Sequence, residues 1–446
     1  MNLDFFDVRA RHRPGQRALL DQCGKLGANL RSQELGIGQP ADRSPWMQNH
    51  RGGVYGPSQR TAPRFVHTGD EGARSSHGRA QPELKGFNKI AATDAGTITG
   101  SPVLGFGILI NGLRVSVNGF SAYTRVTSKH QSSMPPITTA VVGVGYLGRF
   151  HAQKYAQLAD SRLLAVVDID TMAADAVAAE HGVEARYDYR DLLGRVDAVS
   201  IVVPTGLHYE VAAAFLAHGS HVLIEKPMTA TVAEAQALIE LAGAHCRVLQ
   251  VGHLERFNSA ILNLDQVLER PLFIESHRLA PYKPRGTDVS VVLDLMIHDI
   301  DIIMNIVRSD LARVDASGVP VLSGAVDIAN ARLVFENGCV ANVTASRVST
   351  KVERKMRVFQ HDAYISIDFQ DRTLSVHRKG AGEMFPGVAE IESEQFQYED
   401  GDALKTEIEL FLKAIRDDTE PVVSGADGKR ALETAIRITD MVTGRC

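Results

Sequence analysis

The sequence predicts an α/β protein, with a doubly wound parallel sheet followed by a second α/β domain that contains an antiparallel sheet. A glycine-rich turn at residues 143–148 lies between two apolar runs, and runs typical of strands and helices alternate from there to Val251. Shorter alternating apolar runs follow from Ile328 to Ser375. Strands separated by helices indicate a parallel sheet, and alternation of apolar and polar residues indicates an antiparallel sheet with one packed face.

Residues 1–133 differ from the rest in composition. They hold 18 of the 38 glycines and 17 Lys and Arg against 9 Asp and Glu, without a helix-length amphipathic pattern. Such a composition buries too little apolar surface to offset chain entropy. We therefore expect residues 1–133 to be disordered or a spurious N-terminal extension, with Met134 as the true start. A basic arm for anionic partners is an alternative, and so is a transit peptide, which Asp4 and Asp7 disfavour.

Charge and apolar content exclude several classes of protein. The net charge is −5 although residues 1–133 are basic, so the remainder is acidic and would repel nucleic acid. No apolar stretch is long enough to span a membrane. The four scattered cysteines form no CxxC pair and fit a reducing compartment. With no secretory signal, these features predict a cytoplasmic protein without a metal site.

The turn at residues 143–148 has the pattern GxGxxG, formed by Gly143, Gly145 and Gly148 around Tyr146 and Leu147. The first glycine permits the turn, the second lets the backbone approach a pyrophosphate, and the third lets helix and strand pack closely. The pyrophosphate would lie on the N–H groups at the start of the following helix. These residues predict a nucleotide site; the alternative is a glycine-rich turn in another α/β fold.

Asp168 lies 20 residues after Gly148, at the end of the second apolar run. A carboxylate at this position can accept hydrogen bonds from a ribose. Asp170 adds a second carboxylate without a basic neighbour, which would repel a 2′-phosphate. The expected cofactor is therefore NAD rather than NADP.

Further strands place more residues at the same edge of the sheet. Helices are expected at Met172–His181, Tyr189–Leu193, Tyr209–Ala217 and Val232–Ala244, and strands at 199–204, 221–224 and 247–251. Ligands of doubly wound sheets bind beyond the carboxyl ends of the strands. This places Pro204-Thr205, Glu225-Lys226-Pro227 and Gly252-His253 at the site. Lys226 could stabilise an alkoxide beside the nicotinamide; the alternative is an ordinary surface lysine.

With these motifs, the chain from Met134 onward resembles the Gfo/Idh/MocA oxidoreductases. The resemblance rests on residues 143–148, on 204–208 with His208, on 225–227, and on Asp294 to Asp301. It implies an N-terminal Rossmann domain that uses Pro204, Thr205, His208 and Glu225 as well as Lys226 for the cofactor. It also implies a C-terminal α/β domain with an open, mostly antiparallel sheet that carries the substrate wall and an oligomer interface. Met296 stands where the family often has glycine.

Asp294, His298 and Asp301 lie along one face of an otherwise apolar helical pattern over residues 291–304. Polar groups there are costly to bury unless they are paired or face a wet site. The resemblance assigns removal of the hydroxyl proton to His298, with Asp294 orienting it or binding a neighbouring hydroxyl. The alternatives are a solvated acidic stripe and, with only two ligands on the helix, a metal pair.

Residues 252–258 and 285–294 look most like the UDP-N-acetylglucosamine 3-dehydrogenases. That likeness implies oxidation of a sugar-nucleotide 3-hydroxyl by NAD in a homo-oligomer, a dimer or tetramer, ahead of an aminotransferase in lipid A or surface polysaccharide synthesis. The implied substrate residues are Arg256, Asn258, Tyr282, Arg285 and Asp301. Arg278, Tyr282, Lys283 and Arg285 lie in a Pro- and Gly-containing segment and suit a diphosphate, or else form a solvated loop.

The remaining chain completes the second domain. Asn337-Gly338 predicts a hairpin turn, Gly380–Glu399 an irregular excursion, and Leu404–Arg416 and Lys429–Thr443 two closing helices. The expected division is a nucleotide domain over 134–254, a substrate and oligomerisation domain over 255–402, and helices over 403–446 that pack back on the nucleotide domain. Four other functions stay open: a uronic-acid homologue, an inositol or free-sugar dehydrogenase, an NAD-using glycoside hydrolase, and a regulator without turnover.

Overall fold

A computed structural model describes residues 135–282, 290–398 and 401–445, all of which belong to one compact unit. The expectations for residues 1–133, Met134, Lys283 and Arg285 lie outside the described residues. No helix in the described ranges is long and apolar enough to cross a membrane.

The first sheet has six parallel strands in the order β3-β2-β1-β4-β5-β6. This is the strand order of a doubly wound dinucleotide-binding fold, whose ligand crevice lies where the order reverses, between β1 and β4. The strands are β1 (Ile137–Val142), β2 (Ser161–Val167), β3 (Glu184–Arg186), β4 (Ala198–Ile201), β5 (His221–Glu225) and β6 (Leu249–Gly252). The predicted Rossmann sheet is thus confirmed.

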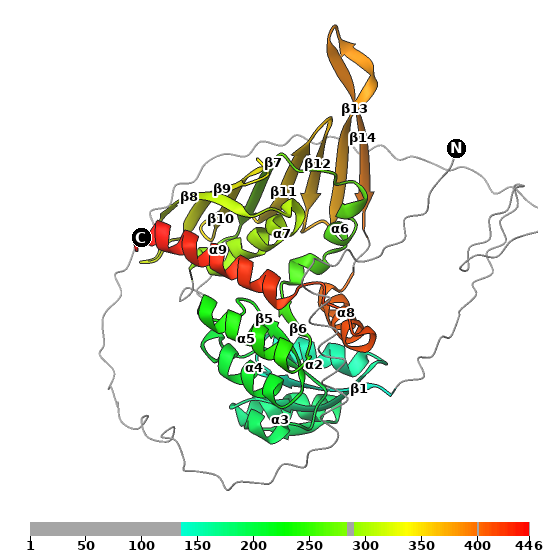
Figure 1. Ribbon diagram of the computed structural model, residues 1–446, viewed down its shortest axis with the longest axis vertical. Coiled ribbons are helices and arrows are strands. Elements are labelled where there is room, and N and C mark those ends of the chain that lie inside the picture. Colours follow the sequence, from blue (N-terminus) through cyan, green and yellow to red (C-terminus); the bar gives the residue numbers. More distant parts are fainter. Residues whose placement is uncertain (1–134, 283–289, 399–400, 446) are drawn as a thin grey trace, which may run out of the picture. The chain divides into compact units, whose positions relative to one another are not determined.

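Helices cover both faces of this sheet (Figure 1). One face packs against α4 (His208–Ala217) and α5 (Val232–Ala244). The other packs against α2 (Gly148–Gln157), α3 (Thr171–His181) and the distant α8 (Ala403–Asp417). A Thr231–Glu234 capping box starts α5 where the sequence pattern placed it.

The second sheet has eight strands in the order β14-β13-β12-β11-β7-β10-β9-β8. All neighbours are antiparallel except β7 and β10, which are parallel. The strands are β7 (Phe273–Leu279), β8 (Leu311–Val319), β9 (Ile328–Phe335), β10 (Val340–Ser346), β11 (Glu353–Gln360), β12 (Ala363–Asp368), β13 (Thr373–Phe385) and β14 (Val388–Gln397). The mostly antiparallel second domain is therefore confirmed, including the turn at Gly338, which has φ +86°.

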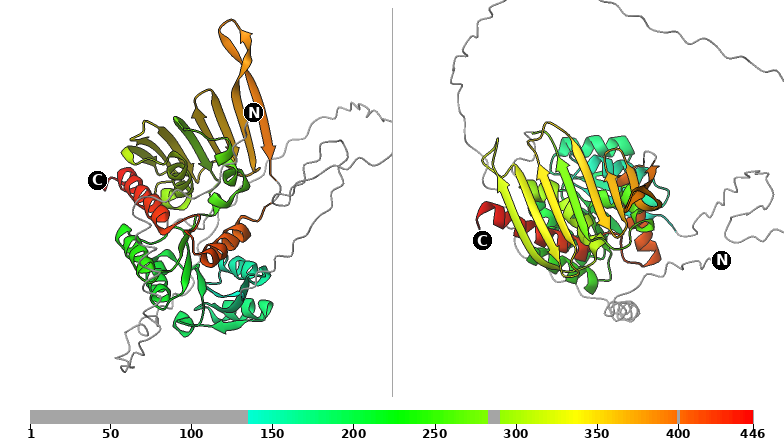
Figure 2. Two further views of the ribbon diagram at one scale, coloured as in Figure 1. Left: turned by 45° about the vertical axis from the view of Figure 1, so that its right-hand side comes forward. Right: turned by 90° about the horizontal axis from the view of Figure 1, so that it is seen from above.

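One face of the second sheet packs against α7 (Ile297–Val307) and α9 (Gly425–Thr443). Figure 2, in the view from above, shows the strands side by side with helices behind them. Helix α9 contacts both α7 and α5, and α8 contacts α2, so the C-terminal helices touch both parts of the chain. The domain limits at 254 and 402 stay predictions. Short helical segments complete the chain: η2 (Tyr189–Leu192), η3 (Thr205–Leu207), η4 (Leu254–Phe257), α6 (Ser259–Leu262), η5 (Leu264–Gln266) and the π-helical turn η6 (Val292–Met296).

Two sequence-based expectations are wrong. The predicted excursion over Gly380–Glu399, of which Glu399 lies outside the described residues, is not irregular as far as Gln397, because β13 and β14 pair as a ribbon that extends beyond the neighbouring strands (Figure 1). Its side chains are mostly exposed on both sides, and its register shifts twice, so no apolar alternation marks it. Arg278 does not lie in a loop, because β7 extends to Leu279.

Candidate active site

The glycine turn connects β1 to α2 and has a different requirement at each glycine. Gly143 has φ +86°, and a Cβ there would lie 2.6 Å from the carbonyl oxygen of Val202. A Cβ on Gly148 would lie 1.7 Å from the carbonyl oxygen of Gly143. No atom lies within 4 Å of the Cβ position of Gly145. The first and third glycines are therefore needed for packing, whereas the second leaves space for a ligand.

The start of α2 is suited to an anion. The helix begins at Gly148 with no side-chain cap at Leu147 and no acidic residue in its first turn. The turn lies at the positive end of the helix dipole. The Arg149 and Phe150 N–H groups bond to the carbonyl oxygens of Gly145 and Leu147 at 3.3 and 2.9 Å. Tyr146 and Leu147 are both exposed beside this turn. The residues present therefore fit a pyrophosphate.

Asp168 follows β2 and holds the glycine turn in place. Its Oδ2 accepts from the Val144 N–H at 2.8 Å, and its Oδ1 accepts from the Asp170 N–H at 3.0 Å. Each carboxylate oxygen can accept a further hydrogen bond, so contact with a ribose stays a prediction. Asp170 caps α3 through bonds from the Met172 and Ala173 N–H groups.

His208 connects the loops after β4 and β5. Its ring nitrogens lie 2.8 Å from the carbonyl oxygen of Val203 and 3.0 Å from that of Pro227. Burial lowers the pKa of His208 despite these carbonyl partners. The ring therefore positions the backbone around the crevice. Direct contacts of Pro204, Thr205 and His208 with the cofactor stay predictions.

Lys226 lies immediately after β5 and reaches into the second part of the chain. Its Nζ donates to the carbonyl oxygen of Asp294 at 2.9 Å and lies 3.5 Å from Asp294 Oδ1. Both side chains keep partial exposure, 20% for Lys226 and 42% for Asp294. The structure thus brings the two predicted catalytic motifs together and leaves the ammonium accessible.

Glu225 anchors the backbone of Lys226. Its Oε2 accepts from the Lys226 N–H at 3.2 Å, and its Oε1 lies 3.2 Å from His151 Nε2. His151 Nδ1 continues to Ser200 Oγ at 3.2 Å, and Ser200 Oγ to the Tyr155 hydroxyl at 2.9 Å. Burial alone would raise the pKa of Glu225, but His151 and Lys226 hold it below its usual value. Glu225 is therefore a half-buried carboxylate that holds the backbone of Lys226 in place.

His298 belongs to α7, one residue past its start and just after the π-helical turn at 292–296. Such turns often occur at functional sites. Burial lowers the pKa of His298 well below its ordinary value, and the cations Lys226 and Arg278 lower it further. The imidazole is therefore neutral at pH 7, as a proton acceptor must be.

Three of the expected substrate residues have protein partners. Arg256 Nη1 donates to Asp301 Oδ1 at 3.3 Å and its Nη2 to the carbonyl oxygen of Val422 at 3.0 Å. Asn258 Oδ1 accepts from the Ala260 N–H, and its Nδ2 donates to the carbonyl oxygen of Phe369, both at 3.1 Å. Contact of Arg256, Asn258 and Asp301 with a substrate stays a prediction. Tyr282 is exposed, and its contact with a substrate also stays a prediction.

Arg278 is not available to clamp a diphosphate. Its Nε and Nη2 donate to the two carboxylate oxygens of Asp299 at 2.9 and 3.0 Å, and its Nη1 donates to Glu255 at 2.8 Å. Burial alone would lower the pKa of Arg278, but these two carboxylates raise it. The sequence pattern could not show this because Asp299 lies on a different element.

The sequence placed Gly252-His253 at the site but assigned no role to the His253 side chain. It follows β6 and is 1% exposed, with its ring edge-to-face against His298 and the ring centres 6.4 Å apart. The only feature of the sequence that indicated a place for His253 at the site was its position just after a parallel strand.

The parallel sheet, the open glycine turn and the cluster of Lys226, Asp294 and His298 define a nucleotide-dependent dehydrogenase. Residues 137–253 match the model of an oxidoreductase family with an NAD-binding Rossmann fold, and residues 270–366 match the GFO/IDH/MocA C-terminal domain. The chain belongs to the Gfo/Idh/MocA family and is an NAD-dependent oxidoreductase.

Named relatives include a UDP-N-acetylglucosamine 3-dehydrogenase of Acidithiobacillus ferrooxidans, which is 42% identical over 67% of this chain and 95% of its own length. A solved structure of that enzyme, GnnA, superposes with a TM-score of 0.66 and covers 70% of this chain and 99% of its own. A myo-inositol 2-dehydrogenase of Thermotoga maritima is 26% identical over 66% of this chain and 92% of its own length. The fold is shared with a Lactobacillus casei scyllo-inositol dehydrogenase solved with NAD(H) and scyllo-inositol, at 20% identity, a TM-score of 0.58, and coverage of 70% of this chain and 98% of that one.

Proposed function

We propose that the protein oxidises the 3-hydroxyl of a UDP-N-acetylhexosamine, with UDP-N-acetylglucosamine as the substrate and the 3-keto sugar nucleotide as the product. The relative that carries this name in Acidithiobacillus ferrooxidans is matched over 95% of its length at 42% identity. The observation that carries the proposal in the structure is the Lys226 Nζ bond to Asp294, four residues before His298. This bond supports a role for the Lys226 ammonium at the carboxyl edge of the nucleotide-binding sheet, next to the helix that carries His298.

Each catalytic residue has a distinct task. NAD, when bound, supplies the acceptor for the hydride that leaves the sugar carbon. His298 accepts the hydroxyl proton on its accessible ring nitrogen, and Lys226 stabilises the negative charge that develops on the oxygen. Asp294 orients the Lys226 ammonium through its carbonyl group and carboxylate.

The chain's own residues also define where NAD would be held. Gly143, Gly145 and Gly148 with Tyr146 and Leu147 would cradle the pyrophosphate, and Asp168 would bind the adenosine ribose. Pro204, Thr205, His208 and Glu225 would line or support the nicotinamide side. The open space at Gly145 supports this assignment, because a backbone there can approach a phosphate closely.

Incubation with NAD and separate substrates tests the proposal. The panel contains UDP-N-acetylglucosamine, its uronic acid analogue and myo-inositol, with an aminotransferase and glutamate added to pull an unfavourable oxidation forward. We expect NADH absorbance and a loss of two hydrogens in UDP-N-acetylglucosamine. Oxidation of the uronic acid or of inositol alone would replace the proposed substrate, and hydrolysis without net NADH would indicate a glycoside hydrolase.

The same proposal includes the enzyme that uses the product and the compartment in which the reaction takes place. An aminotransferase would consume the 3-keto product, in the cytoplasm and on a route to lipid A or a surface polysaccharide. The nucleotide sugar and NAD are both small soluble molecules, which supports a cytoplasmic site of action.

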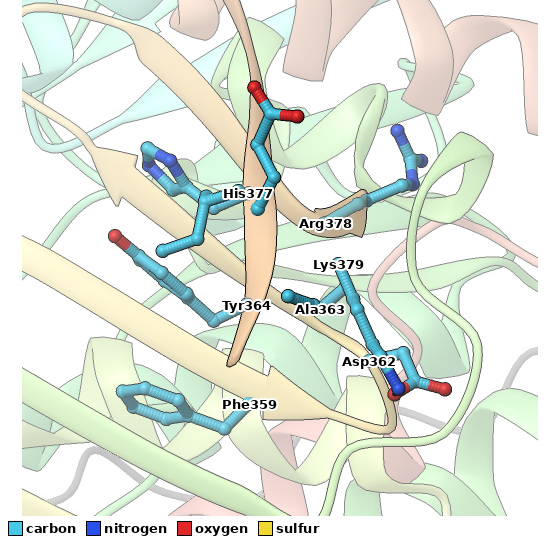
Figure 3. A pocket seen from close by; sticks show the side chains of 10 residues that line it. Phe359, Asp362, Ala363, Tyr364, His377, Arg378 and Lys379 are labelled. Carbon is cyan, nitrogen blue, oxygen red and sulfur yellow. The ribbon is translucent and has the colours of Figure 1, made fainter. Parts of the chain in front are cut away.

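We also propose a homo-oligomer, a dimer or tetramer, formed through the sheet face opposite α7 and α9. On that face Phe273, Phe359, Tyr364 and His377 pack in a row, with ring-centre separations of 5.8, 5.6 and 4.3 Å. Figure 3 shows the last three lining a pocket between β12 and the ribbon. Light scattering should give a multiple of the protomer mass, and Tyr364→Lys should reduce it, with Tyr209→Lys as a surface control.

A further inference from the structure

Four buried polar atoms around His298 have no hydrogen-bond partner among the described residues. They are both ring nitrogens of His253, Nδ1 of His298 and Oδ2 of Asp301. Polar groups buried in a protein are normally hydrogen-bonded, to the protein or to an ordered water. The two rings lie edge to face, and the Asp301 carboxylate acts electrostatically on His253, so the unpaired atoms of these three residues belong to one buried cluster.

The two rings are too far apart to bond directly. His253 and His298 are perpendicular, at 88°, with ring centres 6.4 Å apart. A ring nitrogen lies little more than a bond length from its ring centre, so an N–H···N bond of about 2.9 Å cannot form. One water molecule that bonds both rings can span this separation.

Burial, together with the net effect of the surrounding charges, keeps both rings neutral. Burial lowers the pKa of His253, with Asp301 opposing and Arg256 and Lys226 adding to the effect. His298 faces the cations Lys226, Arg278 and Arg354. A neutral imidazole carries one N–H and one lone pair, so each ring must adopt one of two tautomers.

We propose that a buried water joins His298 Nδ1, one ring nitrogen of His253 and Asp301 Oδ2, and that it holds His298 in the Nδ1–H tautomer. The water accepts from Nδ1–H and donates to His253 and to Asp301. Nε2 of His298 then keeps its lone pair and is the nitrogen that receives the hydroxyl proton. His253 and Asp301 are positioning residues, and this inference rests on the role of His298 in the proposed function.

The negative charge of Asp301 can stabilise His298 after it has accepted the proton. Oδ1 of Asp301 accepts from Arg256 at 3.3 Å, which leaves the buried Oδ2 free to accept a hydrogen bond from the water. When His298 becomes an imidazolium, this carboxylate stabilises the new charge through the water. The proton on Nε2 comes from the substrate hydroxyl, and the hydride passes to NAD, so charge and atoms balance.

A high-resolution crystal structure of the NAD complex tests the water site without any turnover. We expect a water within about 3.2 Å of His298 Nδ1, a His253 nitrogen and Asp301 Oδ2. A protein atom bonded to His298 Nδ1, or no ordered water there, would overturn the proposal. Nitrogen-15 spectra of the histidine rings should report the Nδ1–H tautomer for His298, and the opposite tautomer would overturn it as well.

Kinetics of His253→Phe test the effect on catalysis. We expect kcat to fall at least about tenfold while KM for NAD and for the sugar nucleotide changes less than about threefold, with the acid limb of the pH profile displaced. His253→Asn, which keeps a polar group, should recover part of the rate, and His245→Phe is the exposed control. If His253→Phe does not fold, the crystal and nitrogen-15 results decide. Unchanged kcat and pH profile in folded His253→Phe would overturn the proposal, whereas an inactive wild type would instead overturn the proposed function.

Discussion

The Lys226 ammonium donates to the backbone carbonyl oxygen of Asp294 at 2.9 Å, across 68 positions of the sequence. This bond joins the end of β5 in the parallel sheet to the helical turn that precedes His298. The nearer acceptor is a neutral carbonyl group, at 2.9 Å, and the Asp294 carboxylate oxygen lies farther away, at 3.5 Å. The positive charge of the ammonium is therefore only partly offset by its partner and can stabilise a substrate oxygen. The orientation of Lys226 therefore depends on the position of the helix as well as on its own strand.

Lys226→Ala and His298→Ala should each leave NAD affinity within about threefold of wild type and lower kcat at least about a hundredfold, the low end for loss of a general acid or base. The reason is that both side chains act on the reacting hydroxyl and lie apart from the glycine turn. Calorimetry gives the NAD affinity and coupled absorbance gives kcat. Lys413→Ala, at an exposed surface pair, is the control. Wild-type rates in both variants would contradict the mechanism.

Gly143→Ala and Gly145→Ala should fail in different ways. Gly143 has a positive φ and a Cβ there would collide with the backbone at Val202, so its variant should lose several degrees of Tm. Gly145 has open space, so its variant should keep the wild-type Tm and bind NAD at least about tenfold more weakly. Thermal melts without cofactor and NAD titrations separate the two effects. Equal NAD affinity in Gly145→Ala would exclude a pyrophosphate beside that residue.

Asp168→Asn should narrow the preference for NAD over NADP by at least about tenfold. Removal of the carboxylate charge relieves repulsion of a 2′-phosphate, while the amide oxygen can still accept from the Val144 N–H. The ratio of kcat/KM for the two cofactors measures the change. Asp175→Asn, on the outer side of α3, should leave the ratio unaltered. An unchanged ratio in Asp168→Asn would mean that the 2′-phosphate of NADP does not lie near Asp168.

Glu407→Gln should stabilise the protein at alkaline pH. Burial, and then the negative charge of Glu225, raise the pKa of Glu407 well above its ordinary value. A raised folded-state pKa means that the folded state binds the proton more tightly than the unfolded chain. The stability from this group is therefore full below the ordinary pKa and is lost as pH rises through the folded one. We expect the Tm of Glu407→Gln to exceed that of wild type at pH 8 and the difference to shrink toward pH 5.

The exposed Glu409, on the same helix, provides the matched control. Glu409→Gln should give nearly the same Tm difference at both pH values, because no buried carboxylate is removed. A Glu407→Gln variant that melts below wild type at pH 8 would contradict a buried protonated acid.

Much of the fold follows from local patterns. The glycine turn, the helix at Val232–Ala244 and the hairpin turn at Gly338 depend on residues within a few positions of one another. For the same reason the motifs around Lys226 and His298 could be recognised as separate pieces. Local propensity and turn chemistry act over the same short range as these patterns, so sequence alone determined them.

Only the tertiary structure decided which distant residues meet. Nothing in the sequence indicated that Arg278 pairs with Asp299 and Glu255. A role for the His253 side chain likewise follows only from its contact with His298. The outer part of the β13–β14 ribbon, beyond residue 379, pairs exposed segments and leaves no apolar alternation in the sequence. These features arise from packing and charge pairing between separate elements, and their energies depend on burial and distance, which no linear pattern records.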